Sequence, residues 1–280
     1  MLRIGPSGNS EAFYASGRKH TYEEGEFLHE LGLNAFEYSF GRGVSISDET
    51  ANKIKTEFLK YDVALSVHAP YYTNFSNPDP EMIEKSIGYV LQSAIACNKM
   101  GGERVVVHPA ACGKATRADA VQKAIDNLKL LAEKCKQLPF EHKICLETMG
   151  KNNQIGTVEE VVEFCKLYEK FFPCFDFGHI NSYLHGGIKT KDDYRKILDY
   201  TIKELGFEKA SAMHVHFSKI QYGDKGEIRH LTFADDKYGP DYAPLAELFD
   251  EYGMSPYVVC ESAGTMSDDA LIMKNLHKNA

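Results

Sequence analysis

The chain has 280 residues, of which 43 % are hydrophobic and 26 % are charged, and its formal net charge is −8. This length and composition suit a globular protein with a substantial core. No run of about 18 apolar residues occurs, which excludes a membrane-spanning helix. The negative charge disfavours a generic basic nucleic-acid binder, but bound metal ions would supply local positive charge.

The N-terminal stretch MLRIGPSGNSEAF lacks the basic and apolar segments of a secretory signal. The seven cysteines are scattered without a CxxC pair, and several of them lie within apolar runs, as reduced and buried cysteines do. We therefore expect a cytoplasmic protein. No linker or low-complexity segment divides the chain, so we expect a single domain over residues 1–280.

Short apolar runs rich in β-branched residues alternate along the chain with longer segments of helical period. The predicted strands are LRIG (2–5), AFEYS (35–39), ALSVH (64–68), RVVVH (104–108), KICLE (143–147), PCFDF (173–177), AMHVH (212–216) and YVVCE (257–261). Capping signals precede several predicted helices, such as Thr21 with Glu24 and Thr157 with Glu160. Eight strands alternating with helices predict an α/β fold, a (β/α)8 TIM barrel. A doubly wound open sheet is the alternative, but no GxGxxG follows the first strand.

Metal-competent side chains close six consecutive predicted strands. They are His68, His108, Glu147, Asp176, the pair His214 and His216, and Glu261. The C-terminal strand ends of such a barrel form its catalytic face. Any one of these residues is more often structural, as a helix cap or a hydrogen-bonded histidine. Six at one rim predict a metal site, because carboxylates packed together without cations are unfavourable.

Further candidate ligands lie in the loops. His179 follows Asp176 by three residues, and Glu227 and His230 lie in a predicted long loop after the seventh strand. Together these are more ligands than one ion takes, which is about four or five for zinc. We predict two ions that share a carboxylate and a third ion on the loops, an arrangement typical of phosphoester hydrolysis. Histidine and carboxylate ligands favour Zn²⁺, with Mn²⁺ or Fe²⁺ as alternatives.

Seven motifs resemble, in chain order, the endonuclease IV family of abasic-site endonucleases, a branch of the xylose-isomerase-like TIM barrels. They are SVHAPY (66–71), VVVHPA (105–110), CLETMGKNNQIGTVEE (145–160), FDFGHI (175–180), MHVHFSK (213–219), GEIRH (226–230) and CES (260–262). The resemblance implies three zinc ions and base excision repair by hydrolysis of double-stranded DNA on the 5′ side of an abasic site. We expect the enzyme to act as a monomer.

The resemblance also assigns roles. It implies a first ion on His68, His108 and Glu147, and a second on Glu147, Asp176, the strand-seven histidine and Glu261. It implies a third ion on His179, Glu227 and His230. Glu147 and Glu261 become the catalytic carboxylates, with the attacking hydroxide near Glu261.

Two features depart from the family pattern. MHVHFSK holds two histidines, which face the same side of the strand about 6–7 Å apart. Counting back from Lys219 favours His214 as the ligand, whereas nearness to the strand end favours His216; we prefer His214 and keep both. The spacing from Glu227 to His230 is also one residue longer than the Asp-x-His of the family's best-known members.

Three residues take the places of family residues that insert into DNA at the lesion, namely Tyr71 or Tyr72 and Arg42. A side chain that enters a base step is suited to an enzyme that kinks its substrate. The competing interpretations are that PYYTNF is a packed loop and that Arg42 is a solvated surface charge.

The alternative function is a metal-dependent sugar isomerase or epimerase on the same barrel. Such enzymes resemble this chain at Glu147, Asp176, the strand-seven histidine and Glu261, which hold a single ion such as Mn²⁺. Only the multi-metal interpretation explains the remaining predicted ligands, and these therefore separate the two functions. They are His68, His108, His179, Glu227 and His230. A metal-binding module without catalytic activity would leave the whole ligand set without a use.

Overall fold

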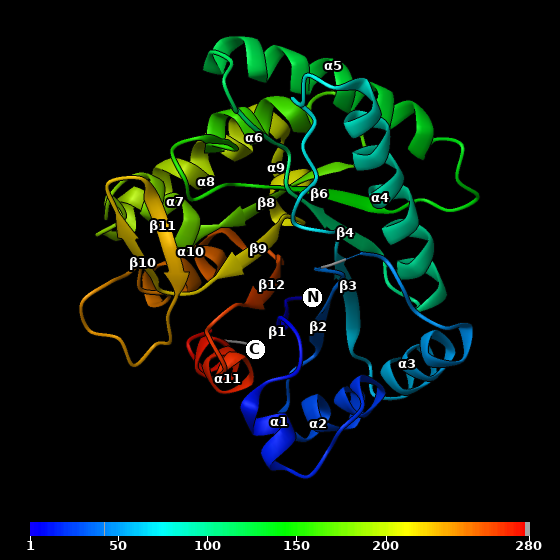
Figure 1. Ribbon diagram of the computed structural model, residues 1–280. Helices are drawn as coiled ribbons and strands as arrows, with labels where there is room; N and C mark the ends of the chain where they lie inside the picture. Colours follow the sequence, from blue (N-terminus) through cyan, green and yellow to red (C-terminus); the bar gives the residue numbers. More distant parts are fainter. Residues whose placement is uncertain (42, 278–280) are drawn as a thin grey trace.

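The computed structural model describes residues 1–41 and 43–277, and within them eight parallel strands form a barrel surrounded by helices (Figure 1). The strands are β1 (Arg3–Pro6), β2 (Ala35–Ser39), β3 (Ala64–His68), β4 (Arg104–Val107), β6 (Lys143–Glu147), β8 (Phe171–Asp176), β9 (His214–Phe217) and β12 (Tyr257–Cys260). The predicted (β/α)8 fold is confirmed. Three predicted strands, 35–39, 64–68 and 143–147, agree with the structure residue for residue.

The barrel closes between its first two strands. Around the sheet the order is β1-β12-β9-β8-β6-β4-β3-β2, and a single parallel bridge from Ser7 to Glu37 joins the last strand to the first. A Cβ on Gly5 would lie 1.6 Å from the carbonyl oxygen of Ala35. Only glycine therefore permits β1 and β2 to approach this closely at the seam.

The helices lie on the outside of the barrel. They are α1 (Glu11–Ala15), the 3₁₀ turn η1 (Thr21–Glu23), α2 (Glu24–Leu31), α3 (Asp48–Lys60), α4 (Pro80–Lys99), α5 (Arg117–Cys135), α6 (Val158–Cys165), α7 (Phe177–Tyr183), α8 (Lys191–Leu205), α9 (Phe207–Ser211), α10 (Ala243–Tyr252) and α11 (Met266–Asn275). The predicted capping box of Thr157 and Glu160 is present at α6. The box predicted at Thr21 is wrong by one residue, because Glu23 accepts a bond from the backbone N–H of His20.

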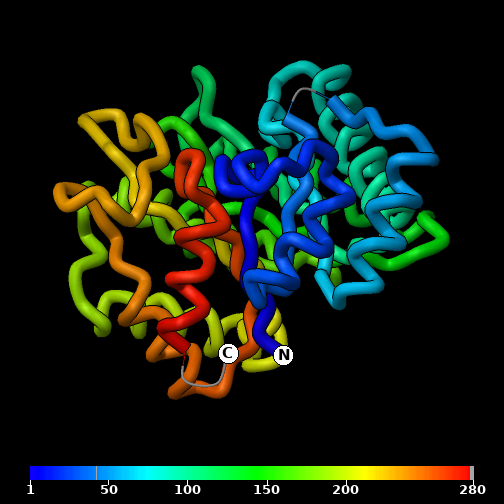
Figure 2. Tube along the Cα trace, turned by 90° about the horizontal axis from the view of Figure 1, so that it is seen from below, coloured from blue at the N-terminus to red at the C-terminus, as the bar shows by residue number. Residues whose placement is uncertain are grey.

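Two short antiparallel sheets stand on the carboxyl ends of the barrel strands. One joins β5 (Ala110–Ala111) to β7 (Gln154–Ile155), and the other is a hairpin of β10 (Ile220–Gly223) and β11 (Gly226–His230). The prediction of a long loop after the seventh strand is therefore wrong, because part of this segment forms the hairpin. Figure 2 shows this hairpin, in yellow, at the end of the barrel opposite the N-terminus. Among the residues described, none of the helices combines the length and the apolar character needed to cross a bilayer.

We expect Glu24→Gln to stabilise the protein above neutral pH. The Glu24 side chain is fully buried in α2, and neither carboxylate oxygen has a hydrogen-bond partner among the residues described. Burial raises its pKa to about 8, against partial opposition from Arg18. The folded state thus prefers the protonated form, and wild-type stability falls as pH rises from about 4.5 towards 8.

Urea unfolding at pH 5 and pH 9 tests this expectation. The amide should differ little from the protonated acid at pH 5 and should gain roughly 4 kcal/mol at pH 9, the scale that such a pKa shift sets. Glu26→Gln, on the exposed face of the same helix, should change stability little at either pH. An equal effect of Glu24→Gln at both pH values would show that ionisation of Glu24 does not matter.

Candidate metal centre

The carboxyl ends of the barrel strands open into a cavity of about 470 Å³. Its lining includes most of the predicted ligands, namely His68, His108, Glu147, His179, Glu227, His230 and Glu261. The side chains come from β3, β6, α7 and β11 and from the segments that follow β4 and β12. Residues separated by up to 193 positions in the sequence thus meet at one rim because parallel strands end there together.

The structure brings the predicted ligands other than His214 into three groups, each with its ligand atoms within 4.8 Å of one another, whereas His214 lies in a fourth such group with Cys174 and His216. The first group is His68, His108 and Glu147; the second group is Glu147, Asp176, His216 and Glu261; the third group is His179, Glu227 and His230. Glu147 belongs to two groups. The proximity of these side chains agrees with the sequence-based ligand sets, and metal ligation by them stays a prediction.

Glu147 is the centre of the cluster. Its Oε2 lies 3.1 Å from Nε2 of both His68 and His108, and its Oε1 lies 3.3 Å from Nδ1 of His179 and 3.4 Å from Nδ1 of His216. Burial acts to raise the pKa of Glu147, but His108 and His216 outweigh it and hold this pKa well below its usual range. Glu147 is therefore an anion, with its two oxygens facing different histidines.

Backbone carbonyl groups orient the two histidines of the first group. Nδ1 of His68 lies 2.7 Å from the carbonyl oxygen of Ala69, and Nδ1 of His108 lies 3.0 Å from that of Tyr71. A proton on Nδ1 satisfies each carbonyl and leaves the Nε2 lone pair free. Both Nε2 atoms then face the same oxygen of Glu147, as the ligands of one ion would.

Asp176 ends β8 and also caps α7. Its Oδ1 accepts the backbone N–H of His179 at 2.7 Å, so the interpretation as a helix cap is correct for this oxygen. Its Oδ2 is buried and makes no hydrogen bond within the described residues, although Nδ1 of His179 lies 3.3 Å from it. A buried carboxylate oxygen without a hydrogen bond is costly unless a cation lies beside it. The second group therefore fits a divalent ion, and one side chain serves both as cap and as candidate ligand.

The β10–β11 hairpin carries Glu227 and His230, and a β-bulge adjusts their spacing. Tyr222 pairs with Glu227 and Gln221 pairs with Arg229, so Ile228 is an extra residue on β11. Without the bulge, residues three apart on a strand would face opposite sides. With Ile228 bulged out, Glu227 and His230 face the same side, as residues two apart do. The long spacing noted in the sequence is thereby accommodated.

The loop after β6 ties this hairpin to His179. The backbone N–H of Glu227 donates to the carbonyl of Gly150 at 2.9 Å, and Nε2 of His179 lies 3.4 Å from Oε2 of Glu227. A Cβ on Gly150 would lie 2.9 Å from side-chain atoms of both His179 and Glu227. The absence of a side chain at Gly150 thus lets the third group assemble.

Of the two strand-seven histidines, His216 lies in the second group. It pairs with Asp176 in the β8–β9 register, and its Nδ1 lies 3.4 Å from Oε1 of Glu147 and 3.5 Å from Oε1 of Glu261. His214 lies deeper in the barrel, where burial lowers its pKa to about 4. This placement favours His216 over His214 for the second group, because His216 lies nearer the rim, and ligation by either histidine stays a prediction.

Glu37 is a buried residue of this region that the sequence reasoning missed. It lies in the middle of β2, its side chain is fully buried, and its carboxylate oxygens lie about 3 Å from both strand-seven histidines, at 3.1 Å for His214 and 2.9 Å for His216. The signal was available, because a glutamate inside the short apolar run AFEYS is out of place unless it has a partner.

The charges of the cluster also suit divalent ions. Burial raises the pKa of Glu261, with further raising by Asp176 and Glu147 against the opposing histidines. Burial by itself lowers the pKa of His216, but its acidic neighbours outweigh this and raise it well above its usual range. The cluster thus favours positive charge between its anionic side chains, which divalent ions would supply.

The predicted DNA-facing residues are only partly described. Tyr71 lines the cavity, is about half exposed, and shares a 2.7 Å hydrogen bond between its hydroxyl and that of Ser39. Tyr72 is also exposed, but it packs against Tyr89 and does not line the cavity. Arg42 lies outside the described residues.

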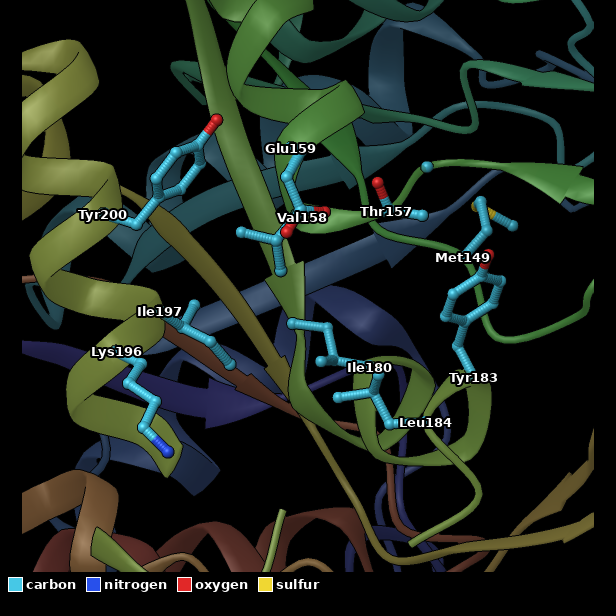
Figure 3. Close-up of a pocket in the computed structure, with 11 residues that line it drawn as sticks. Met149, Thr157, Val158, Glu159, Ile180, Tyr183, Leu184, Lys196, Ile197 and Tyr200 are labelled. Carbon is cyan, nitrogen blue, oxygen red and sulfur yellow. The ribbon is translucent and has the colours of Figure 1, made fainter. Parts of the chain in front are cut away.

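A second hollow of about 200 Å³ lies beside the metal centre, between α6, α7 and α8 (Figure 3). Its walls are mainly apolar and include Ile180, Leu184 and Ile197. Met149 borders both this hollow and the cavity of the three groups. None of its lining residues is a histidine, so the candidate metal chemistry belongs to the first cavity.

Comparisons with known proteins agree with this fold. Residues 26–276 match the model of a family described as xylose isomerase-like TIM barrel. An uncharacterized protein of Methanocaldococcus jannaschii is 31 % identical over 249 residues, which is 89 % of each chain. A probable endonuclease 4 of Acholeplasma laidlawii is 32 % identical over 162 residues, covering 56 % of this chain and 53 % of that one.

Solved structures show the same fold at low sequence identity. Endonuclease IV from Thermus thermophilus superposes with a TM-score of 0.65 at 17 % identity, covering 93 % of this chain and 95 % of that one. A D-psicose 3-epimerase superposes with a TM-score of 0.64 at 13 % identity, covering 90 % of this chain and 84 % of that one. Endonuclease-like and epimerase-like barrels are thus both among the structural neighbours.

Proposed function

The chain belongs to the xylose isomerase-like TIM barrel family, and we propose that within it the protein is a metal-dependent endonuclease that hydrolyses DNA on the 5′ side of abasic sites. The relatives named as probable endonuclease 4 and the likeness to endonuclease IV support this proposal. The substrate would be double-stranded DNA, and the role would be base excision repair. Zinc is the ion that best suits the donor set, with Mn²⁺ or Fe²⁺ as alternatives.

The observation that carries the proposal is the presence of three ligand groups at one cavity, two of them joined through Glu147. A single-ion enzyme would need the second group alone. His68 and His108, and the third group on α7 and the hairpin, have no use in that case. Clustered divalent ions are suited to phosphoester hydrolysis, because they stabilise charge on both the attacking and the leaving oxygen.

The protein's own residues would then hold and orient the reacting groups. Glu147 would be shared by the first and second ion sites, and Glu261, at the edge of the cavity, would hold the attacking water. Tyr71 stands beside His68, with a ring-centroid distance of 4.6 Å, where an exposed aromatic ring can contact the nucleotide at the lesion. The bound ions would supply the positive charge that this acidic chain lacks towards DNA phosphates.

The second candidate function is epimerisation or isomerisation of a sugar. One specific observation favours it: the second group by itself forms a complete four-residue ligand set. Epimerase-like proteins are also among the structural neighbours. In this case the other two groups would hold no ion. Metal content therefore separates the two candidates.

The test is cleavage of a duplex that contains one abasic site, with an intact duplex of the same sequence as the matched control. We expect cleavage at the abasic position only, by protein that contains about three ions per chain. Incubation with ketoses in the presence of Mn²⁺ tests the alternative. One ion per chain, an untouched abasic duplex and an epimerised ketose would together replace the endonuclease by the sugar enzyme.

A further inference from the structure

Glu37 is a buried carboxylate beneath the metal centre that none of the three ligand groups includes. Its side chain faces the barrel interior from β2 and is fully buried. The hydroxyl of Ser66 donates to its Oε2 at 2.8 Å. Taking a carboxylate out of water costs several kcal/mol unless partners compensate. Its contacts should therefore explain why a charged residue lies in the middle of this strand.

The two ring nitrogens of His216 face different carboxylates. Nε2 lies 2.9 Å from Oε1 of Glu37, below the rim, and neither of these two buried atoms makes a hydrogen bond of good geometry within the described residues. Nδ1 lies 3.4 Å from Oε1 of Glu147 and 3.5 Å from Oε1 of Glu261, within the second group. A neutral imidazole carries one proton, so a proton held on Nε2 by Glu37 leaves the Nδ1 lone pair for an ion.

His214 lies on the other side of Glu37. Its Nε2 lies 3.1 Å from Oε2 of Glu37. Its ring stacks on that of Tyr257, with centroids 5.0 Å apart, and the Tyr257 hydroxyl bonds to the carbonyl of Phe36 at 2.9 Å. Glu37 thus lies between a hydrogen bond from Ser66 and the ring of His214, and both of these residues are outside the second group. This arrangement gives the second histidine of the strand a use that is not metal ligation.

We propose that Glu37 is a positioning residue, which accepts the Nε2 proton of His216 and so presents Nδ1 of His216 to the ion of the second group. The proposal rests on the proposed metal centre and names a residue that controls one of its ligands. Metal-bound histidines generally donate their other N–H to a carboxylate or carbonyl group, and loss of that partner typically weakens metal binding 10–100-fold. The carbonyl groups beside His68 and His108 serve those ligands in the same way.

The experiment compares metal binding by the wild type, Glu37→Gln and Glu24→Gln, measured by competition with a chelator and by visible spectra of the cobalt-loaded protein. Glu24 is the matched control, because it is an equally buried glutamate that belongs to none of the ligand groups. We expect Glu37→Gln to weaken the binding of one of the three ions roughly 10–100-fold and to change the visible spectrum of cobalt at that site. The other two ions should keep their wild-type affinities, and Glu24→Gln should keep all three.

A general loss of structure would lower the affinity for all three ions together. A loss of affinity for one ion alone therefore identifies a positioning role for Glu37. If Glu37→Gln does not fold, Glu37→Asp replaces it, since the shorter acid keeps the charge but withdraws from His216. Wild-type affinity for every ion in the variant that folds would overturn the proposal. A fourth ion that is lost in Cys174→Ser would also overturn it, because Cys174 lies together with His214 and His216, and these histidines would then be ligands of that ion. These measurements need no DNA, so inactivity on abasic sites would reject the proposed function and leave the role of Glu37 standing.

Discussion

Glu147→Gln is expected to lower the rate of abasic-site cleavage by roughly 10³-fold or more, because it removes the one anion shared by two ligand groups. The neutral amide keeps the size of the side chain but cannot bridge two cations. His68 and His108 would lose the carboxylate oxygen that both of them face at 3.1 Å. Metal analysis of the same variant should show loss of the first and second ions, with the third ion retained.

Glu24→Gln again serves as the buried control and should leave the cleavage rate unchanged. Circular dichroism and thermal unfolding of Glu147→Gln establish that the variant is folded before its rate is interpreted. A folded Glu147→Gln protein that holds all its ions and cleaves at the wild-type rate would remove Glu147 from the centre of the site.

Removal of the ions by a chelator is expected to abolish cleavage and to destabilise the fold. The ligands come from strands spaced around the barrel, so bound ions tie β3, β6, β8, β9 and the hairpin together. An ion present at a thousand times its dissociation constant contributes about 4 kcal/mol to stability. Thermal unfolding before and after chelation measures this loss, and adding Zn²⁺ back should restore both stability and cleavage.

Metal affinity is also expected to fall as the pH falls. Burial by itself lowers the pKa of His68, His179 and His216, but acidic neighbours outweigh burial and raise all three above the usual value of 6.5. Each histidine must release its proton before it can bind an ion, so affinity should fall about tenfold per pH unit for each proton released. Chelator competition between pH 6 and 8 measures the slope. A flat profile, or full cleavage after chelation, would contradict a role for ions on these histidines.

The barrel and its rim could be predicted because the signals are local. A run such as ALSVH is apolar and β-branched, and its last residue, His68, falls at the strand end whatever its neighbours are. Since parallel strands end at one face, the proximity of His68, Glu147 and Glu261 follows from the fold class alone. The family resemblance then supplied the division of the ligands into three sets.

Other features depend on contacts that no single segment encodes. The β10–β11 hairpin was taken for a loop; its two strands pair with each other, and hydrogen bonds with residues 150–152, far away in the sequence, hold its turn in place. The choice between His214 and His216 depends on the stagger of neighbouring strands, which a motif count does not contain. Glu37 went unnoticed because its two histidine neighbours lie on β9, 177 or more residues further along the chain.

The bulge at Ile228 has a consequence for how relatives of this protein are recognised. A sequence pattern written as an acid, one residue and a histidine would reject this chain, although the two side chains converge on the same neighbour. The strand absorbs the insertion by turning one residue outwards, where Ile228 is 58 % exposed. The spacing between the acid and the histidine should therefore be counted only in residues that face the cavity. Chains that a strict spacing rule excludes should be compared again on that basis.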